Sequence, residues 1–302
     1  MNRTLEIGKF LLRVSVFIHA VALFIIVFQT RQTQFGVLLF MDWLSEFEDP
    51  HLAAVLFEKI TVSLYIAAGV VVLFKPYGAL LLFMAGYAFL EALSGVMNNG
   101  SRYSEWSLVE QALRYGSPLV LLILASGSQM NLMRRWNRQL ATALLRILVA
   151  LVFFSHGYLA LLGYPRFIDL IIGTSANIFG SRLSEASTVT LLKWTGGIDF
   201  GVALAVLIFP TPLFIPRRFW ASPSQHSLIR RAVVPTLMLW LAAWGLVTAL
   251  SRITALGLPT GLSQYPELLI RTSHMLGPLA LWALLVGCHA PSSESADPSD
   301  LK

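Results

Sequence analysis

The stretch that decides the fold is 144–165, which reads Leu-Leu-Arg-Ile-Leu-Val-Ala-Leu-Val-Phe-Phe-Ser-His-Gly-Tyr-Leu-Ala-Leu-Leu-Gly-Tyr-Pro. This apolar run is about as long as the roughly 20 residues that a helix needs to cross a bilayer. Arg146 lies near its start and His156 lies inside it. Because ionisable side chains are costly in lipid, the run predicts a transmembrane helix whose polar side chains face other helices.

The composition of the whole chain also indicates a membrane protein. Of its 302 residues, 56% are hydrophobic and 13% are charged, and the mean hydropathy is +0.69. A soluble domain usually carries about 25% charged residues. The net charge of +6 does not indicate nucleic-acid binding, because Lys and Arg gather in the loops of membrane proteins. We therefore expect membrane lipid, and no nucleic acid, as a partner.

The residue types exclude several kinds of chemistry. Cys288 is the single cysteine, so an internal disulfide, a dithiol redox centre and a four-cysteine iron-sulfur cluster within this chain are excluded. There is no phosphate-binding loop and no H-E-x-x-H metal motif, which disfavours hydrolysis of the kind found in soluble enzymes. The first apolar run, from Phe10, lacks a cleavage pattern, so we expect a retained helix.

Eight apolar segments predict an all-α integral membrane protein with eight transmembrane helices. They run approximately over 10–29, 54–74, 77–97, 107–126, 140–162, 189–209, 232–251 and 267–288. Basic side chains concentrate in one set of loops and acidic side chains in the other. Because cytoplasmic loops are rich in Lys and Arg, we expect both termini on the cytoplasmic side of a cell's inner (plasma) membrane.

The long loops 30–53 and 163–188 are then expected on the outer side, and 290–302 as a disordered cytoplasmic tail. Each long loop contains an apolar stretch, 35–44 or 167–173, that is too short to cross the bilayer. Such a stretch fits either a cover lying at the headgroups or a functional lid.

The two halves of the chain correspond at several points. His19 corresponds to His156, Lys59 to Lys193, and Ala92-Leu93-Ser94 to Ala249-Leu250-Ser251. The segments 114–119 and 274–279 both carry a basic side chain first and a proline fifth. An even number of helices per copy gives both copies the same orientation. We therefore predict two parallel-repeat four-helix units, 1–128 and 129–289.

A family resemblance rests on the second half. Arg146, His156-Gly157, Tyr164-Pro165 and Gly196-Gly197-Ile198-Asp199 resemble the opening helices of DoxX-like membrane proteins. The resemblance implies a membrane component of a redox system, with quinone or an oxidoreductase subunit as partner. Two departures affect this expectation. The region where the family has a lysine holds Tyr158, Leu161 and Leu162 here. Ser63-Leu64-Tyr65 occupies the region where the first half would need the acid of its second helix.

Ionisable residues inside the spans are the candidate ligand-binding residues, because each costs roughly 2.5–3.5 kcal/mol on insertion scales. Asp199 lies near the middle of its span and is the strongest candidate, with Thr195 one turn away as a hydrogen-bond partner. The alternative is a protonated aspartic acid that holds helices together. The full set is Asp199, His156, His274, His19, Glu91 and Arg114.

Other roles remain open for several of these residues. Glu91 and Arg114 lie at similar depths on adjacent helices and fit a structural ion pair. The histidines fit structural hydrogen bonding, a quinone contact or, less well, a pair of ligands to heme b. Pro118 and Pro278 predict kinks inside their helices. Arg13 and Arg146 fit side chains that reach the lipid phosphates.

Three functions therefore remain open. The first is a quinone-interacting component of a membrane redox system. The second is a small-solute transporter or channel, which the repeats and kinked helices suggest. The third is a non-catalytic scaffold or lipid-binding subunit. The sequence assigns no catalytic residue and no metal site.

Overall fold

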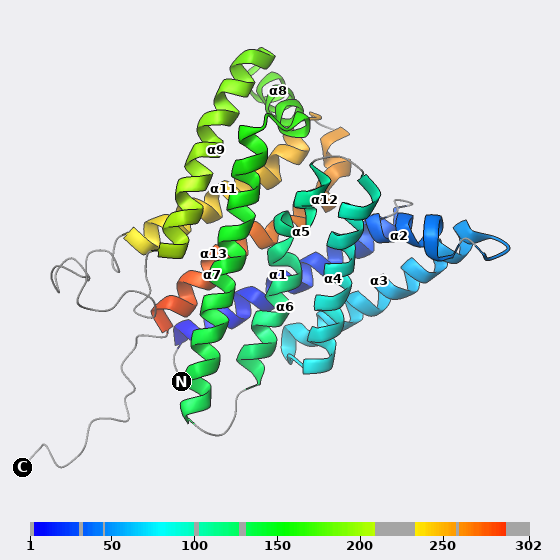
Figure 1. The fold of residues 1–302 in the computed structure, drawn as a ribbon, viewed down its shortest axis with the longest axis vertical. Helices are drawn as coiled ribbons and strands as arrows, with labels where there is room; N and C mark the ends of the chain where they lie inside the picture. The colour runs from blue at the N-terminus through cyan, green and yellow to red at the C-terminus, as the bar shows by residue number, and fades with distance from the viewer. Residues whose placement is uncertain are drawn as a thin grey trace, which may run out of the picture.

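The computed structural model describes residues 3–29, 33–44, 46–99, 103–126, 131–208, 233–257 and 260–287, and the described residues form helices without any strand (Figure 1). In chain order the elements are α1 (Arg3–Phe28), α2 (Gln34–Leu38), the π-helix η1 (Leu39–Trp43), α3 (Pro50–Phe74), α4 (Gly78–Asn99), the 3-10 helix η2 (Ser104–Trp106), α5 (Ser107–Glu110), α6 (Ala112–Ala125), α7 (Asn131–Leu161), α8 (Pro165–Phe179), α9 (Glu185–Ile208), α11 (Val234–Thr254), the 3-10 helix η5 (Thr260–Gln264), α12 (Tyr265–Ile270) and α13 (Thr272–Gly287). The predicted tail 290–302 and Cys288 lie outside the described residues.

Within the described residues, seven helical segments are long and apolar enough to cross a bilayer, so the chain is a multi-pass membrane protein. The predicted fourth segment is interrupted, because α5 ends at Glu110 and α6 starts at Ala112. With 14 residues, α6 alone is about 21 Å long, short of the roughly 30 Å of hydrocarbon. The last segment has a similar break between α12 and α13, but with η5 it reaches spanning length.

The helix contacts follow the same pattern in the two halves of the chain. The helix α1 packs against α3 and against α13, while α7 packs against α9 and against α6. The helix α4 packs on α6, and α11 packs on α13. Each half also has a shorter helix near one end of the bundle: α2 contacts α4 and α3, and α8 contacts α11 and α9. In Figure 1, α8 lies across the top, between the upper ends of α7 and α9.

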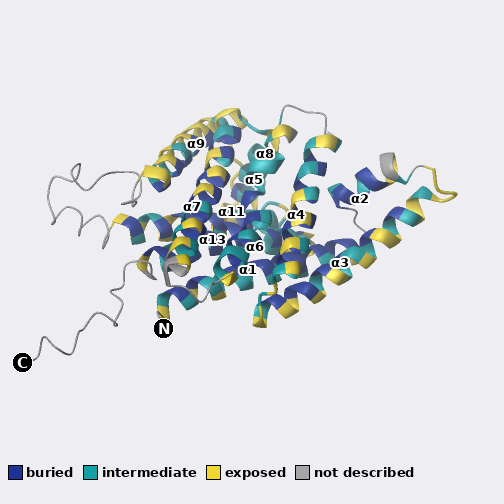
Figure 2. Cartoon of the chain, turned by 60° about the horizontal axis from the view of Figure 1, so that its bottom comes forward, coloured by how far each residue is buried: buried dark blue, intermediate teal, exposed yellow. Residues whose placement is uncertain are grey.

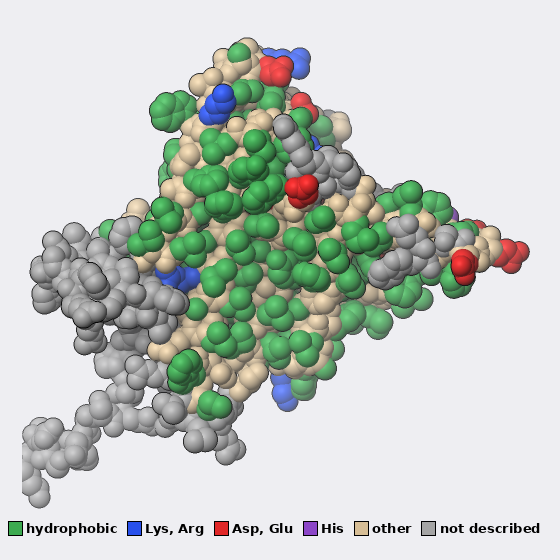
Figure 3. Space-filling view, in the orientation of Figure 1, with side chains coloured by type: hydrophobic (Ala, Val, Ile, Leu, Met, Phe, Trp, Pro, Cys, Tyr) green, Lys and Arg blue, Asp and Glu red, His purple; other side chains and the backbone are tan. Residues whose placement is uncertain are grey.

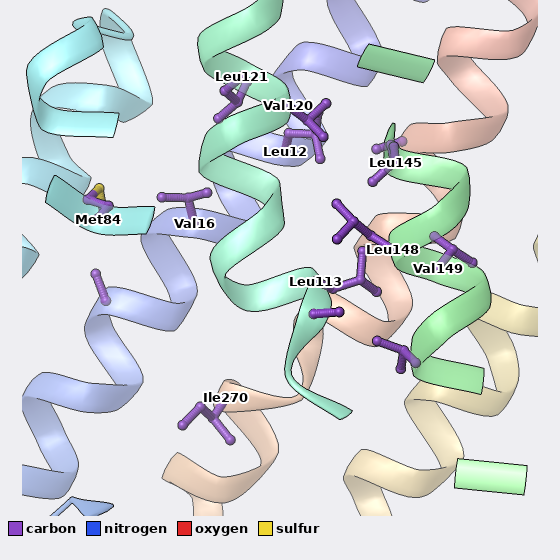
Figure 4. Close-up of a cluster of buried hydrophobic side chains, with 14 of the residues drawn as sticks. Leu12, Val16, Met84, Leu113, Val120, Leu121, Leu145, Leu148, Val149 and Ile270 are labelled. Carbon is purple, nitrogen blue, oxygen red and sulfur yellow. The ribbon is translucent and has the colours of Figure 1, made fainter. Parts of the chain in front are cut away.

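The hydrophobic core lies where the halves meet. It includes Leu12 of α1, Leu113 and Leu121 of α6, and Leu145 and Leu148 of α7 (Figure 4). Figure 2 shows buried residues concentrated along these central helices and exposed ones along the outer faces.

The outer surface is apolar along the helices, as lipid requires. Phe74 is 77% exposed and Trp194 is 73% exposed. In Figure 3 hydrophobic side chains cover most of the visible helical face, and charged side chains lie mainly near its edges. Exposed apolar side chains on spanning helices are the expected lipid-facing surface, since the bilayer core is hydrocarbon.

The side chain of Arg146 holds the end of α9, and the predicted lipid-phosphate contact is wrong. Arg146 is 4% exposed. Its Nη2 donates to the carbonyl oxygens of Val206 at 2.8 Å and Leu207 at 2.6 Å, and its Nε donates to Val206 at 3.1 Å. Those carbonyls belong to the last turn of α9, which lacks intrahelical donors. In the first half, Arg13 donates similarly to the carbonyl of Phe74 at the end of α3, at 3.3 Å.

A pair of glycines brings α7 and α9 close together. A Cβ on Gly196 would lie 2.7 Å from the carbonyl oxygen of Gly157, and a Cβ on Gly157 would lie 2.9 Å from that of Gly196. Both distances are shorter than a non-bonded contact allows. Small residues at such a crossing let two membrane helices approach closely. The crossing therefore fixes α9, and with it Asp199, against α7.

We expect Gly196→Ala to destabilise the protein, because the added methyl group must push two backbones apart. Overpacking of this kind costs about 1–3 kcal/mol, which thermal unfolding of the detergent-purified protein would detect as a lower melting temperature. Gly197→Ala is the matched control, since no heavy atom lies within 4 Å of its Cβ position. Equal melting temperatures for the two variants would contradict the proposed tight crossing.

Candidate functional site

One cavity of about 320 Å³ lies among α7, α8, α9, α11 and α13, and we call it the α8 cavity. Its lining is mainly apolar and includes Phe167, Leu170, Ile171, Phe179, Leu183 and Leu191. Its polar lining includes His156, Thr195, Asp199, Arg252, Arg271 and His274. A largely apolar cavity with a few convergent polar groups is the usual form of a small-molecule site.

Asp199 of α9 lines the part of the cavity that α11 covers. The indole N–H of Trp244 donates a hydrogen bond to the Asp199 carboxylate. Thr195, the partner expected from the sequence, instead donates from Oγ1 to the carbonyl of Leu192 at 3.1 Å. The pair Asp199 and Trp244 therefore joins α9 to α11 at the cavity wall. The carboxyl group of Asp199 also borders the mainly apolar cavity, where it can accept a further hydrogen bond.

Two imidazoles lie side by side at another part of the lining. The ring centroids of His156 and His274 are 5.3 Å apart, with the rings nearly perpendicular at 75°. Nδ1 of His156 donates to the carbonyl of Val152 at 2.8 Å, which leaves its Nε2 facing the Glu110 carboxylate at 3.9 Å. Nδ1 of His274 lies 3.1 Å from the carbonyl of Arg271. Each ring is thus held by a backbone carbonyl that lies four or three residues earlier in the chain.

The break between α5 and α6 brings Glu110 to these imidazoles. The Glu110 carbonyl oxygen lies 3.4 Å from Nε2 of His274, and its carboxylate lies near His156. At the matching break, the backbone N–H of His274 donates to the carbonyl of Arg271 at 2.9 Å. The two interrupted helices therefore meet at the edge of the cavity, where backbone groups are available to side chains.

Two arginines complete the polar lining. Arg252 lies in the last turn of α11, and Arg271 lies at the break between α12 and α13. Both are only partly exposed, and the Nε atom of each is buried without a hydrogen-bond partner among the described residues. The cavity thus combines apolar walls, one carboxylate, two imidazoles and two guanidinium groups. This set of groups can bind an amphipathic molecule and exchange a proton with it.

The other predicted site residues lie elsewhere. The Glu91 carboxylate accepts hydrogen bonds from the backbone N–H groups of Gln34 at 3.2 Å and Phe35 at 3.0 Å. Arg114 donates to the side chain of Gln111 at 2.9 Å. Among the ion pairs of the described residues there is none between the Glu91 carboxylate and Arg114, so the alternative of a structural ion pair is not supported. Glu91 instead satisfies free donors at the start of α2.

His19 has its own environment in the first half. Its Nδ1 lies 3.2 Å from the hydroxyl oxygen of Tyr65, and the two rings pack edge to face. His156 has His274 as its imidazole neighbour, so His19 and His156 do not form a pair across the molecule. Within the described parts of the chain, no three His, Cys, Asp or Glu side chains form a group that could hold a metal ion.

Sequence reasoning missed three residues that define the site, namely Glu110, Trp244 and Arg271. Glu110 and Arg271 lay near the expected span ends, where charges are ordinary, and the helix breaks that bring them inward were not expected. The correspondence between the halves could have pointed to Trp244. It lies five residues before Ala249, as Tyr87 lies five residues before the corresponding Ala92, so both halves have an aromatic residue at this position.

Comparison with protein-family models, with curated proteins and with solved structures gave no match. The resemblance to DoxX-like proteins therefore rests on the short motifs quoted above.

We expect Glu91→Leu to loosen the start of α2, because the backbone N–H groups of Gln34 and Phe35 lose their acceptor. Leaving buried donors unpaired costs about 1–3 kcal/mol each, so amide exchange over 33–38 should accelerate about tenfold or more in hydrogen–deuterium exchange. Glu91→Gln keeps one acceptor oxygen and should have a smaller effect. An equal acceleration in Arg114→Leu would point back to the ion pair that the geometry does not support.

Proposed function

We propose that this protein binds a lipid-soluble, amphipathic molecule in the α8 cavity, as a quinone-interacting component of a membrane redox system would. The observation that carries the proposal is the convergence of Asp199, His156 and His274, from three different helices, on one mainly apolar cavity. Each of these groups costs roughly 2.5–3.5 kcal/mol in a membrane helix. Structural hydrogen bonding alone does not require them to border a shared empty space.

The residues of the cavity fit a quinone ring. Aromatic and aliphatic side chains such as Phe167 and Leu170 would hold the ring, and Trp244 orients the carboxyl group of Asp199. A bound quinone would supply two-electron, two-proton redox chemistry. The part of this chain would be to exclude water, to orient the ring, and to exchange a proton at the Asp199 carboxyl oxygen. The proposal that the ligand is a quinone of a redox system comes from the resemblance to DoxX-like proteins.

A small-solute transporter is less well supported. Transport of a hydrophilic solute needs a path lined by polar groups or water. The walls of the cavity that α8 and α9 contribute are mainly aliphatic and aromatic. This lining favours a ligand that enters from the lipid.

We further propose that the chain consists of two units, 1–128 and 129–289, whose eight segments are arranged as parallel repeats. The matching helix contacts and the breaks before α6 and α13 support this arrangement. The ligand site then belongs to the second unit. The first unit contributes Glu110 at its edge.

We expect Asp199→Asn to weaken the binding of decylubiquinone at least tenfold, because a charge-assisted or proton-sharing contact is lost. Titration calorimetry on the purified full-length protein provides the measurement. Glu58→Gln is the matched control, since Glu58 is a buried carboxyl group in the first half that does not line the cavity.

A second variant tests the location of the ligand. Leu170→Trp adds bulk to the apolar wall and should abolish decylubiquinone binding. Binding of equal strength in the wild type and Leu170→Trp would show that the ligand does not occupy the α8 cavity.

A further inference from the structure

Positive charge is in excess around the cavity wall formed by α11 and α13. Arg252 interacts electrostatically with Arg271, Arg166, Glu267 and Glu110. Arg114 adds a further guanidinium group near Arg271 and the same two glutamates. These four guanidinium groups have three carboxylate neighbours, Glu110, Glu267 and, for Arg114, Glu91. The Glu110 carboxylate also faces His156 at 3.9 Å.

The two arginines that line the cavity are not satisfied by the described part of the protein. No carboxylate of a described residue lies within 4.0 Å of the guanidinium nitrogens of Arg252 or Arg271. The Nε of each is buried without a partner. Burying a guanidinium donor without an acceptor is costly, because water no longer solvates it. Two such groups on one cavity wall favour an anion between or beside them.

We propose that the molecule held in the α8 cavity is an amphipathic anion whose carboxylate or phosphate head lies at Arg252 and Arg271. Its apolar chain would lie along α8 and α9, against Leu170, Ile171 and Leu191. Fatty acids and phosphate-headed lipids share this chemistry. The inference rests on the part of the proposed function that places an amphipathic ligand in the α8 cavity, and it names an anion in place of the neutral quinone.

A purely structural role does not explain why both arginines lie side by side at the cavity wall. Arg252 lies in the last turn of α11, where a cation complements the helix dipole. Arg271 lies at the break, where it is the C-cap of the short helix α12 and directly precedes α13, so the dipoles of the two helices act on its charge in opposite directions. Its position beside Arg252 therefore adds repulsion that an anionic ligand would relieve.

The test compares three twelve-carbon ligands that differ in their heads: dodecanoate, dodecyl phosphate and dodecanol. Radiolabelled forms bind at pH 8 to the full-length protein in neutral detergent, and a scintillation proximity assay measures the affinity. We expect at least one of the two anions to bind ten times more tightly than dodecanol. The stronger anion identifies the source as a free fatty acid or a phosphate-headed lipid.

Variants assign the head to the arginines. Arg252→Gln and Arg271→Gln should each weaken binding of the preferred anion by about tenfold to a hundredfold, and should leave dodecanol binding unchanged. Arg166→Gln is the matched control, because it removes a nearby positive charge from an exposed residue that does not line the cavity. Arg271→Lys keeps the charge and should retain most of the binding, which separates loss of the contact from misfolding.

The outcomes distinguish the two proposals. Dodecanol binding as tightly as both anions, or anion binding that survives both Gln substitutions, overturns the anionic head. If decylubiquinone still binds in that case, the proposed function stands. If decylubiquinone and all three twelve-carbon ligands fail to bind the wild type, both proposals fail.

Discussion

The structure depends on one constraint, which is that polar backbone groups inside a bilayer must find partners within the protein. Backbone groups inside a helix bond to each other, but the first N–H groups and the last carbonyls of a helix have no partner within it. Side chains from other helices supply the missing partners here. Arg146 of α7 donates to the carbonyls of Val206 and Leu207 in the last turn of α9. Glu91 of α4 accepts from the backbone N–H groups at the start of α2.

The same constraint accounts for the position of the candidate site. The breaks before α6 and α13 take the carbonyls of Glu110 and Arg271 out of regular helical hydrogen bonding, and the Arg271 carbonyl accepts from the backbone N–H of His274. The His274 imidazole lies within hydrogen-bond distance of both carbonyls. A neutral imidazole has one N–H to donate, so its shorter contact, at 3.1 Å to Arg271, is the one it best satisfies. The imidazoles therefore stand at the cavity edge partly because the helices are interrupted there.

The sequence predicted the helices well and their side-chain partners poorly, for a physical reason. Hydropathy identifies which residues lie in lipid, and the cost of burying charge identifies Asp199, His156 and His274 as residues that face inward. Neither signal gives the rotation of one helix against another. Glu91 and Arg114 were therefore paired by depth alone, although each has a different partner.

Helix breaks were the second feature that hydropathy could not reveal. Gln111 and Arg271 interrupt helices within apolar segments without a proline or glycine at the break itself. Pro118 and Pro278, which the sequence marked as kinks, lie inside α6 and α13 instead. Glu110 and Arg271 fall near the starts of the predicted spans 107–126 and 267–288, and neither was singled out as a candidate.

Two buried tyrosines stand in the first half at the positions aligned with Asp199 and Trp244. The positions that correspond to Asp199 and Trp244 in the first half are Tyr65 and Tyr87, judged by their spacing from the matching segments. Both tyrosines are buried, with ring centroids 5.1 Å apart, and the Tyr65 hydroxyl meets His19 at 3.2 Å. At the aligned positions of the second half, Asp199 and Trp244 border the α8 cavity. The sequence correspondence thus joins positions with different surroundings, an aromatic packing contact beside His19 and a cavity lining beside His156.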